Sequence, residues 1–267
     1  MDALFHLGSA VAISIVLSVL AYRLRLLTLT GALSSFAVGI VIGFFGSLSW
    51  LLVLVSFTFV GFIVTRIDMA EKTRMGLQEG HHGERSHTNV LAVGIPPCVL
   101  AIAAFLMGDQ YVMAASVGYI SVISVAASDT VASELGVKYE KVWLITNFQR
   151  VPPGTDGGVS VKGTIWALVG AVCASVLGWA IVFPHDLLNP LMLIPIMAGF
   201  AGCLMDSVLG ATLETKGLIN KYGNNAITML LGGFLGMLVY ISGCDVKSIF
   251  SFDCQSLKCS ITKVGMP

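Results

Sequence analysis

The chain has 267 residues, of which 56% are hydrophobic and only 11% are charged. Soluble domains carry roughly 25% charged residues, so this chain has too few charges to cover a surface that faces water. Its fifteen basic and fifteen acidic residues cancel, which argues against a nucleic-acid-binding protein. The composition indicates an all-α integral membrane protein whose main solvent is lipid.

Apolar runs that approach or reach the length needed to cross a bilayer follow one another along the chain. They are residues 3–22, 30–46, 48–66, 89–107, 111–128, 163–183, 190–210 and 225–243. We therefore predict a polytopic helix bundle of about eight spans, with seven to nine as the range. Gly46 and Ser47 predict a turn between the second and third runs. Arg23 and Arg25 follow the first run, and no basic leader precedes it, which favours a retained span over a cleaved signal peptide.

The basic residues alternate between loops. Twelve of the fifteen Lys and Arg residues lie in the loops after the first, third, fifth and seventh runs, and the alternate loops carry none. The positive-inside rule assigns these four loops to the cytoplasm and both termini to the outside. Two of the four, residues 67–88 and 129–162, are long and polar. We expect a multi-pass protein of a prokaryotic plasma membrane with one active face, which is cytoplasmic.

Residues 1–243 are predicted to form a single transmembrane catalytic domain, and residues 244–267 a C-terminal tail. The tail holds Cys244, Cys254 and Cys259, which could form a disulfide if the tail is extracytoplasmic. None of the six cysteines forms a CxxC pair, so a zinc site is not indicated.

The most unusual segment is residues 151–160, with the sequence VPPGTDGGVS, which we call the Gly-rich loop. Its prolines favour an extended entry, and its glycines allow positive φ and a close approach of the backbone. Successive backbone N–H groups in such a loop can bind an anion, and a helix predicted to start near Lys162 directs its positive end to the same place. The alternative is an ordinary Gly-rich turn before a helix. The predicted phosphate-binding residues here are Gly154, Thr155, Asp156, Gly157, Gly158, Ser160 and Lys162.

Two acidic residues, Asp129 and Glu134, come at the cytoplasmic end of the fifth run. On an ideal helix they point about 140° apart, so both can serve one site only if the helix unwinds near Gly136. Acidic side chains at a membrane boundary are either surface groups or functional ones, and the nearby Gly-rich loop favours function.

A third carboxylate, Asp206, lies inside an apolar run and should face the bundle interior, with Gly210 and Glu214 on the same stripe. Carboxylates from separate helices are ligands that Mg²⁺ prefers, with nucleotide phosphates completing its shell. A structural, hydrogen-bonded Asp206 is the alternative.

The loop after the third run offers Arg85 and Lys72 for phosphates, although a basic loop that only sets topology is an alternative. Its adjacent His81 and His82 lack a second ligand pair for zinc. Asn225, at the start of the last run, is either part of a helix N-cap or a polar contact to substrate.

Several motifs together resemble a known membrane family from roughly residue 5 to 243. The family contains plant phytyl-phosphate kinase and animal transmembrane protein 19, and phytol and dolichol kinases are more distant relatives. The sequence departs from its pattern at Glu71, where a paired Lys is usual, and at Asn89, where Gln is usual. The motifs are Ser128-Asp129-Thr130 with Ala132-Ser133-Glu134 and Gly136; Val151 to Thr155 with Gly157 to Ser160; Asp206-Ser207 with Leu209 to Thr212; and Arg85 with Asn89 to Ala92.

The resemblance implies phosphorylation of an isoprenyl monophosphate, phytyl or geranylgeranyl, by a nucleoside triphosphate, with CTP favoured. Phosphoryl transfer needs charge neutralisation and positioning more than covalent chemistry. We predict that Asp129, Glu134 and Asp206 bind Mg²⁺, that the Gly-rich loop and Lys162 bind the donor, and that the isoprenyl chain lies between helices. We predict that Arg85 and Arg150 bind the acceptor phosphate.

Other functions stay open. A lipid or small-molecule transporter or flippase would also use an intramembrane carboxylate such as Asp206, but it should show related halves and polar groups through the membrane depth. A cytidylyltransferase that forms a CDP-lipid would share the magnesium and nucleotide features. A non-catalytic scaffold leaves the Gly-rich loop unexplained. A homodimer is compatible with the sequence.

Overall fold

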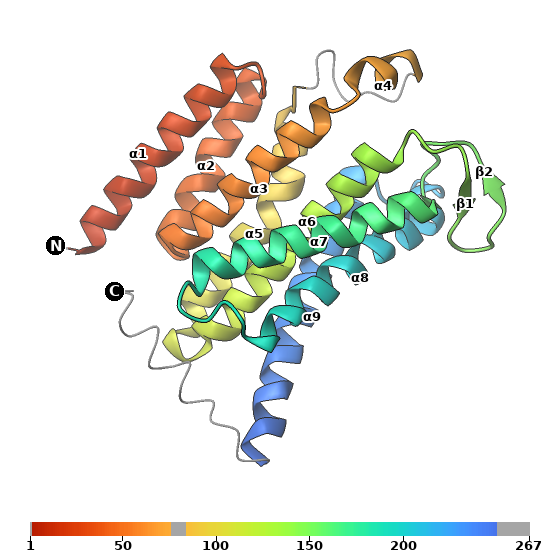
Figure 1. The fold of residues 1–267 in the computed structure, drawn as a ribbon. Coiled ribbons are helices and arrows are strands. Elements are labelled where there is room, and N and C mark those ends of the chain that lie inside the picture. The colour runs from red at the N-terminus through yellow and green to blue at the C-terminus, as the bar shows by residue number, and fades with distance from the viewer. Residues whose placement is uncertain (1, 76–83, 250–267) are drawn as a thin grey trace.

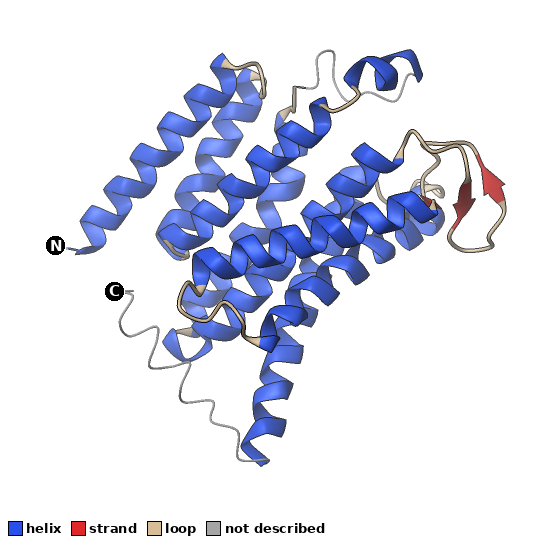
Figure 2. Cartoon of the chain, viewed as in Figure 1, coloured by secondary structure: helices blue, strands red, loops and turns tan. Residues whose placement is uncertain are grey.

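The computed structural model describes residues 2–75 and 84–249, which are mostly helical (Figures 1 and 2). Short 3-10 turns, Asp109–Tyr111 and Pro190–Met192, precede α6 and α8, and a π-helical turn, Gly210–Glu214, continues α8. The helices are α1 (Asp2–Arg23), α2 (Leu29–Phe45), α3 (Leu48–Arg66), α4 (Met69–Met75), α5 (His87–Met107), α6 (Val112–Gly136), α7 (Val161–Val182), α8 (Leu193–Leu209) and α9 (Lys221–Ile249).

The predicted membrane helix bundle is confirmed. Within the described ranges six helices, α3 and α5 to α9, are long and apolar enough to cross a membrane, and α1 and α2 add two shorter apolar helices. The predicted turn between the second and third spans is also confirmed, because Ser47 caps α3 by accepting a hydrogen bond from the Trp50 amide at 3.1 Å. The protein is therefore an integral, multi-pass membrane protein.

Helix α6 is the centre of the bundle. Every residue from Ala114 to Ser128 is buried, and α3, α5, α7, α8 and α9 pack around it. We expected the span to end at residue 128 and to unwind near Gly136, but α6 stays helical to Gly136. The unwinding that a shared site for Asp129 and Glu134 was thought to require does not occur, and the two residues point about 140° apart around the helix.

Small residues let the neighbouring helices approach α6 closely. A Cβ atom added to Gly199 of α8 would lie 1.9 Å from Ser124 Oγ, and one added to Gly202 would lie 2.4 Å from Val125 Cγ2. On the α7 side, Ser128 Oγ donates to the Ala167 carbonyl at 2.8 Å. Such packing stabilises helices in lipid, where apolar burial between helices contributes little.

A small antiparallel sheet lies at one end of the bundle, beyond α6 and α7 (Figure 1). Strand β1 (Val142–Leu144) pairs with β2 (Arg150–Val151) on one side and β3 (Gly158–Val159) on the other. The sheet is an addition to the predicted all-helical fold. Because β2 and β3 both bind β1, the Gly-rich loop between them is held at both ends.

The Gly-rich loop contacts the end of α8 through Gly157. Gly157 has φ +75°, and a Cβ atom there would lie 2.4 Å from the Ala211 Cβ and 2.5 Å from its backbone nitrogen. Ala211 belongs to the π-helical turn, a feature often found at functional sites. After the loop, Ser160 caps α7 by accepting from the Gly163 amide at 3.0 Å, so α7 begins at Val161, close to the predicted start.

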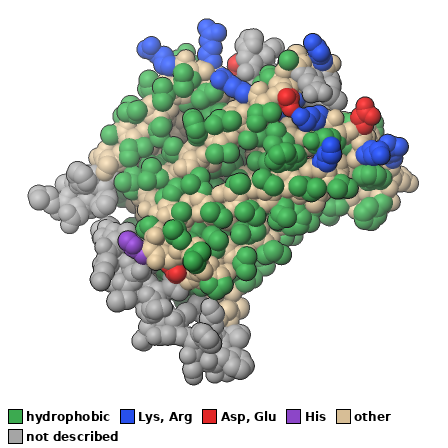
Figure 3. Space-filling view, viewed as in Figure 1, with side chains coloured by type: hydrophobic (Ala, Val, Ile, Leu, Met, Phe, Trp, Pro, Cys, Tyr) green, Lys and Arg blue, Asp and Glu red, His purple; other side chains and the backbone are tan. Residues whose placement is uncertain are grey.

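Charged side chains gather at the end of the bundle that carries α4 and the sheet, while the flank in view is largely hydrophobic (Figure 3). This distribution agrees with the predicted separation of long basic loops from the short loops opposite.

Replacing Gly199 with Ala should destabilise the bundle by about 1–3 kcal/mol, because the new methyl group overlaps Ser124 on the central helix. Thermal unfolding in detergent measures the change. Gly8→Ala is the matched control, since nothing lies within 4 Å of a Cβ at that helical position. Equal melting temperatures for the two variants would contradict the close packing of α8 on α6.

Replacing Gly157 with Ala should release the loop from α8. Protease cleavage within residues 152–157 should accelerate about tenfold, which corresponds to about 1.4 kcal/mol. Gly217→Ala is the control, because Gly217 also has a positive φ (+69°) but no atom lies within 4 Å of its added Cβ. If both variants are cleaved at the wild-type rate, the loop is not held by this contact.

Candidate functional site

A cavity of about 300 Å³ opens between the Gly-rich loop and helices α6, α7, α8 and α9. Its volume lies at the lower end of the range for small-molecule sites, about 300–1,000 Å³. The predicted site residues that line it are Asp129, Glu134, Gly154, Thr155, Asp156, Gly157, Gly158, Ser160, Asp206 and Asn225. The structure thus brings two distant motifs, the Gly-rich loop and Asp206, to one place beside α6.

Asp129 and Asp206 approach this cavity from α6 and α8. Both residues also line a small adjoining cavity of about 10 Å³, so they lie where the two cavities meet. Asp206 Oδ1 accepts a hydrogen bond from Thr228 Oγ1 at 3.3 Å. The orientation of the Asn225 amide that satisfies its neighbours adds a second donor to Asp206 Oδ1, also at 3.3 Å. Helix α9 therefore orients the Asp206 carboxylate.

Asn225 lies within α9 and is not its cap. Helix α9 starts at Lys221, and Asn220 supplies the cap by accepting from the Gly223 amide at 2.8 Å. The N-cap interpretation of Asn225 is therefore wrong. Its neighbour Asn224 is buried and donates to the Asp206 carbonyl at 3.0 Å.

Asn224 also has a buried acceptor atom without a partner. Its Oδ1 has no hydrogen-bond partner among the described residues, which is unusual in a folded protein. Its amide nitrogen contacts Glu214 Oε2 at 3.4 Å, at the end of the π-helical turn.

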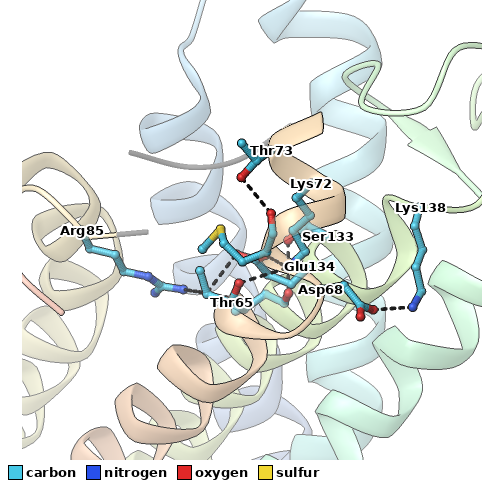
Figure 4. A network of polar contacts seen from close by, with 10 residues as sticks. Thr65, Asp68, Lys72, Thr73, Arg85, Ser133, Glu134 and Lys138 are labelled. Atoms are coloured by element: carbon cyan, nitrogen blue, oxygen red, sulfur yellow. Dashed lines mark hydrogen bonds and ion pairs between the residues drawn. The ribbon is translucent and has the colours of Figure 1, made fainter. Parts of the chain in front are cut away.

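Glu134 borders the cavity, but both of its carboxylate oxygens are engaged by residues outside the cavity lining. Its Oε1 accepts from Thr65 Oγ1 at 2.9 Å, and its Oε2 pairs with Lys72 Nζ at 2.5 Å, on the side of α6 that faces α3 (Figure 4). Across the described ranges, no group of three His, Cys, Asp or Glu side chains could hold a metal ion. Because Thr65 and Lys72 engage Glu134, Asp129 and Asp206 are the two predicted carboxylates that could hold a metal ion at the cavity.

The three predicted cationic residues also lie elsewhere. Arg85 donates to Thr65 Oγ1 at 3.2 Å in the same network as Glu134. Lys162 lies over the Tyr139 ring, 4.3 Å from its centroid, and Arg150 is exposed on β2. Arg85, Lys162 and Arg150 are not among the described residues that line the large cavity.

The cation at the cavity is instead Lys221, from the first turn of α9. Sequence reasoning assigned it only to a basic loop. A signal was present, because Lys221 and Asn225 are four residues apart, as are Asn224 and Thr228, so the four side chains form a polar stripe at helical spacing.

A second ion pair lies near the network of Thr65, on the surface. Lys138 Nζ donates to Asp68 Oδ2 at 2.5 Å (Figure 4). This hydrogen bond, with the charge of Lys138, holds the pKa of Asp68 below its ordinary value. The predictions made for His81, His82 and the cysteines of the tail fall outside the described side chains.

The cavity offers hard oxygen donors. Asp129 and Asp206 line it together with Asn, Thr and Lys residues, and the Gly-rich loop borders the same space. Such oxygen donors fit Mg²⁺, which is usually held by one or two carboxylates and completed by water or phosphate. The arrangement can therefore bind a phosphate group together with a divalent cation.

The comparisons place this chain among membrane proteins. A membrane protein of Methanocaldococcus jannaschii, described as uncharacterized, is 34% identical over 241 residues, which cover 90% of this chain and 97% of the relative. Two Arabidopsis thaliana proteins also match. Protein PGR is 30% identical over 233 residues, covering 80% of this chain and 81% of the relative. Protein VTE6, chloroplastic, is 29% identical over 200 residues, covering 74% and 59%.

No solved structure matches the chain. A family model described as integral membrane protein DUF92 matches residues 12–244, which include the Gly-rich loop, both carboxylates of the cavity and the helices around them. The chain belongs to this family of integral membrane proteins.

Proposed function

We propose that the protein is an isoprenyl-phosphate kinase. It transfers the terminal phosphoryl group of a nucleoside triphosphate, with CTP favoured, to phytyl or geranylgeranyl phosphate at the cytoplasmic membrane face. The observation that carries the proposal is one cavity in a membrane bundle that Asp129, Asp206 and the Gly-rich loop line together. The motif resemblance to the family of plant phytyl-phosphate kinase supplies the reaction class.

In this reaction an oxygen of the acceptor phosphate attacks the terminal phosphorus of the donor. The bond from that phosphorus to the bridging oxygen breaks, and the nucleoside diphosphate leaves with both electrons of the bond. Gly157 of the Gly-rich loop and Lys221 of α9 line the cavity and bind the donor phosphates. Thr228 and Asn225 orient Asp206. Asp129 and Asp206 would hold Mg²⁺, which would supply charge neutralisation for the phosphates.

A transporter is less well supported by the distribution of polar groups. The buried part of α6 from Ala114 to Ser128 carries no charged side chain. Its hydroxyl groups are bound inside the bundle, as when Ser124 and Ser128 donate to backbone carbonyls of α7. Charged residues are concentrated at one end (Figure 3). A translocation path would need polar groups through the depth of the membrane.

The nucleotide label separates the kinase from a cytidylyltransferase. Purified protein is incubated with phytyl or geranylgeranyl phosphate and with CTP, ATP or GTP labelled on either the α or the γ phosphorus. A kinase moves the γ label into the lipid and leaves the α label in solution. Incorporation of the α label, or no labelled lipid from any pair, would contradict the proposal.

Asp129→Asn and Asp206→Asn should each lower the rate of transfer at least about 100-fold, because each removes a charge that binds the metal–triphosphate complex. Initial rates with the γ-labelled donor measure the effect, and thermal unfolding verifies that the variants are folded. Asp68→Asn is the matched control, since it removes a carboxylate from an exposed ion pair outside the cavity. A rate within twofold of wild type for Asp129→Asn would exclude Asp129 from the site.

A further inference from the structure

A second polar cluster lies on the α3 side of α6, where Thr65, Lys72, Arg85 and Glu134 meet (Figure 4). Thr65 is at its centre, because its hydroxyl donates to Glu134 Oε1 at 2.9 Å and accepts from Arg85 Nη2 at 3.2 Å. Lys72 Nζ pairs with Glu134 Oε2 and donates to the Thr65 carbonyl at 3.2 Å. The four residues come from α3, α4, α6 and the segment before α5, so tertiary packing assembles them.

The cluster holds one more positive charge than negative. Both oxygens of Glu134 are taken, and Lys72, which is only 4% exposed, neutralises it. Arg85 has no carboxylate partner among the described residues, since the two ion pairs found there do not include it. Its Nε is buried without a hydrogen-bond partner, and its guanidinium lies over the Phe62 ring at 5.8 Å. A half-satisfied guanidinium at a partly buried position is suited to an anion that arrives from outside.

The position of Arg85 links it to the carboxylate pair. A Cβ atom on Gly61 would lie 3.7 Å and 3.9 Å from the two terminal guanidinium nitrogens and 4.0 Å from Thr130 Cγ2. Gly61 therefore leaves the space between Arg85 and Thr130 free of a side chain. Thr130 follows Asp129 on α6 and lines the small cavity that Asp129 and Asp206 share. Arg85 thus lies on the α3 side of α6, close to the residue that follows Asp129.

We propose that this cluster binds the phosphomonoester of the lipid acceptor, so that donor and acceptor reach Asp129 from opposite faces of α6. This inference rests on the proposed kinase function. Arg85 contacts the phosphate, and Thr65, Lys72 and Glu134 are positioning residues that orient its guanidinium. Lys72 keeps Glu134 from cancelling the charge of Arg85. On the same α3 helix, Phe59 and Ile63 are 64% and 50% exposed and offer apolar surface to an isoprenyl chain.

Binding without turnover tests the inference. Wild-type protein in lipid nanodiscs is titrated with geranylgeranyl phosphate in the absence of nucleotide, and inorganic phosphate is used as a competitor. Arg85→Gln should weaken binding of the lipid about tenfold to a hundredfold, the loss expected for a charge-assisted hydrogen bond. Arg85→Lys should recover only part of the affinity, because Lys lacks Nε and the planar fork. The affinity for CTP should stay within twofold of wild type in both variants.

Two further variants keep the test decisive. Gly61→Val should weaken lipid-phosphate binding by filling the space beside Thr130, even where Arg85 substitutions reduce folding. Lys138→Gln is the matched control, since it removes a cation from an exposed pair in the same region and should change nothing. In turnover, Arg85→Lys should raise the KM for the lipid without raising the KM for the nucleotide.

Three results would overturn the inference: wild-type affinity for the lipid in Arg85→Gln, an equal loss of CTP affinity, or competition by inorganic phosphate as strong as that of the lipid. The kinase proposal fails separately. If the wild type binds geranylgeranyl phosphate through Arg85 but transfers no γ label to it, the cluster is a lipid-phosphate site and the kinase proposal is wrong.

Discussion

The structure depends on one helix that must stay continuous in lipid. Helix α6 is buried over the whole of Ala114 to Ser128, and in the membrane interior its backbone groups can be satisfied only by its own helical hydrogen bonds. Unwinding it among its neighbours would expose amides that have no water to bind. Continuity also decides where side chains point when the helix emerges at the charged end. Asp129 then lines the cavity beside the Gly-rich loop, and the carboxylate of Glu134, five residues on, is bound by Thr65 of α3. One helix thereby separates two polar clusters.

The cost of charge in lipid explains why both clusters lie at the same end. A charged side chain costs several kcal/mol at the bilayer centre, about 2.5–3.5 kcal/mol on insertion scales, and much less near the headgroups. Within the bundle, small residues replace charges as the means of holding helices together, as at Gly199 and Gly202 against α6. The sheet and the Gly-rich loop add polar backbone only beyond the helix ends, where water reaches it. Asp206 is a charged residue within a membrane helix, and α9 supplies hydroxyl and amide donors to its carboxylate.

The spans could be predicted because hydropathy depends on local sequence. The three motifs that hold Asp129, Asp206 and the Gly-rich loop could also be recognised locally, and the structure brings them to one cavity. Positions set by tertiary contacts could not be predicted. The engagement of the Glu134 carboxylate by Thr65 and Lys72 could not be predicted, because these partners come from other helices. The sheet was missed because strands of two and three residues are too short to show alternation. Long cationic side chains such as Lys162 go where tertiary packing directs them, in this case onto Tyr139.

The two clusters, taken with the proposed reaction, suit the stereochemistry of phosphoryl transfer. The attacking and leaving oxygens must lie roughly in line on opposite sides of the phosphorus. A soluble nucleotide and a membrane-bound lipid also arrive from different directions, and both carry phosphates that repel each other. Binding them on opposite faces of α6, at the Gly-rich loop and at Arg85, keeps the like charges apart until both meet at Asp129 and Asp206. If both ligands instead shared the loop side, Arg85 would have no anion to bind, and its buried Nε would remain a cost without compensation.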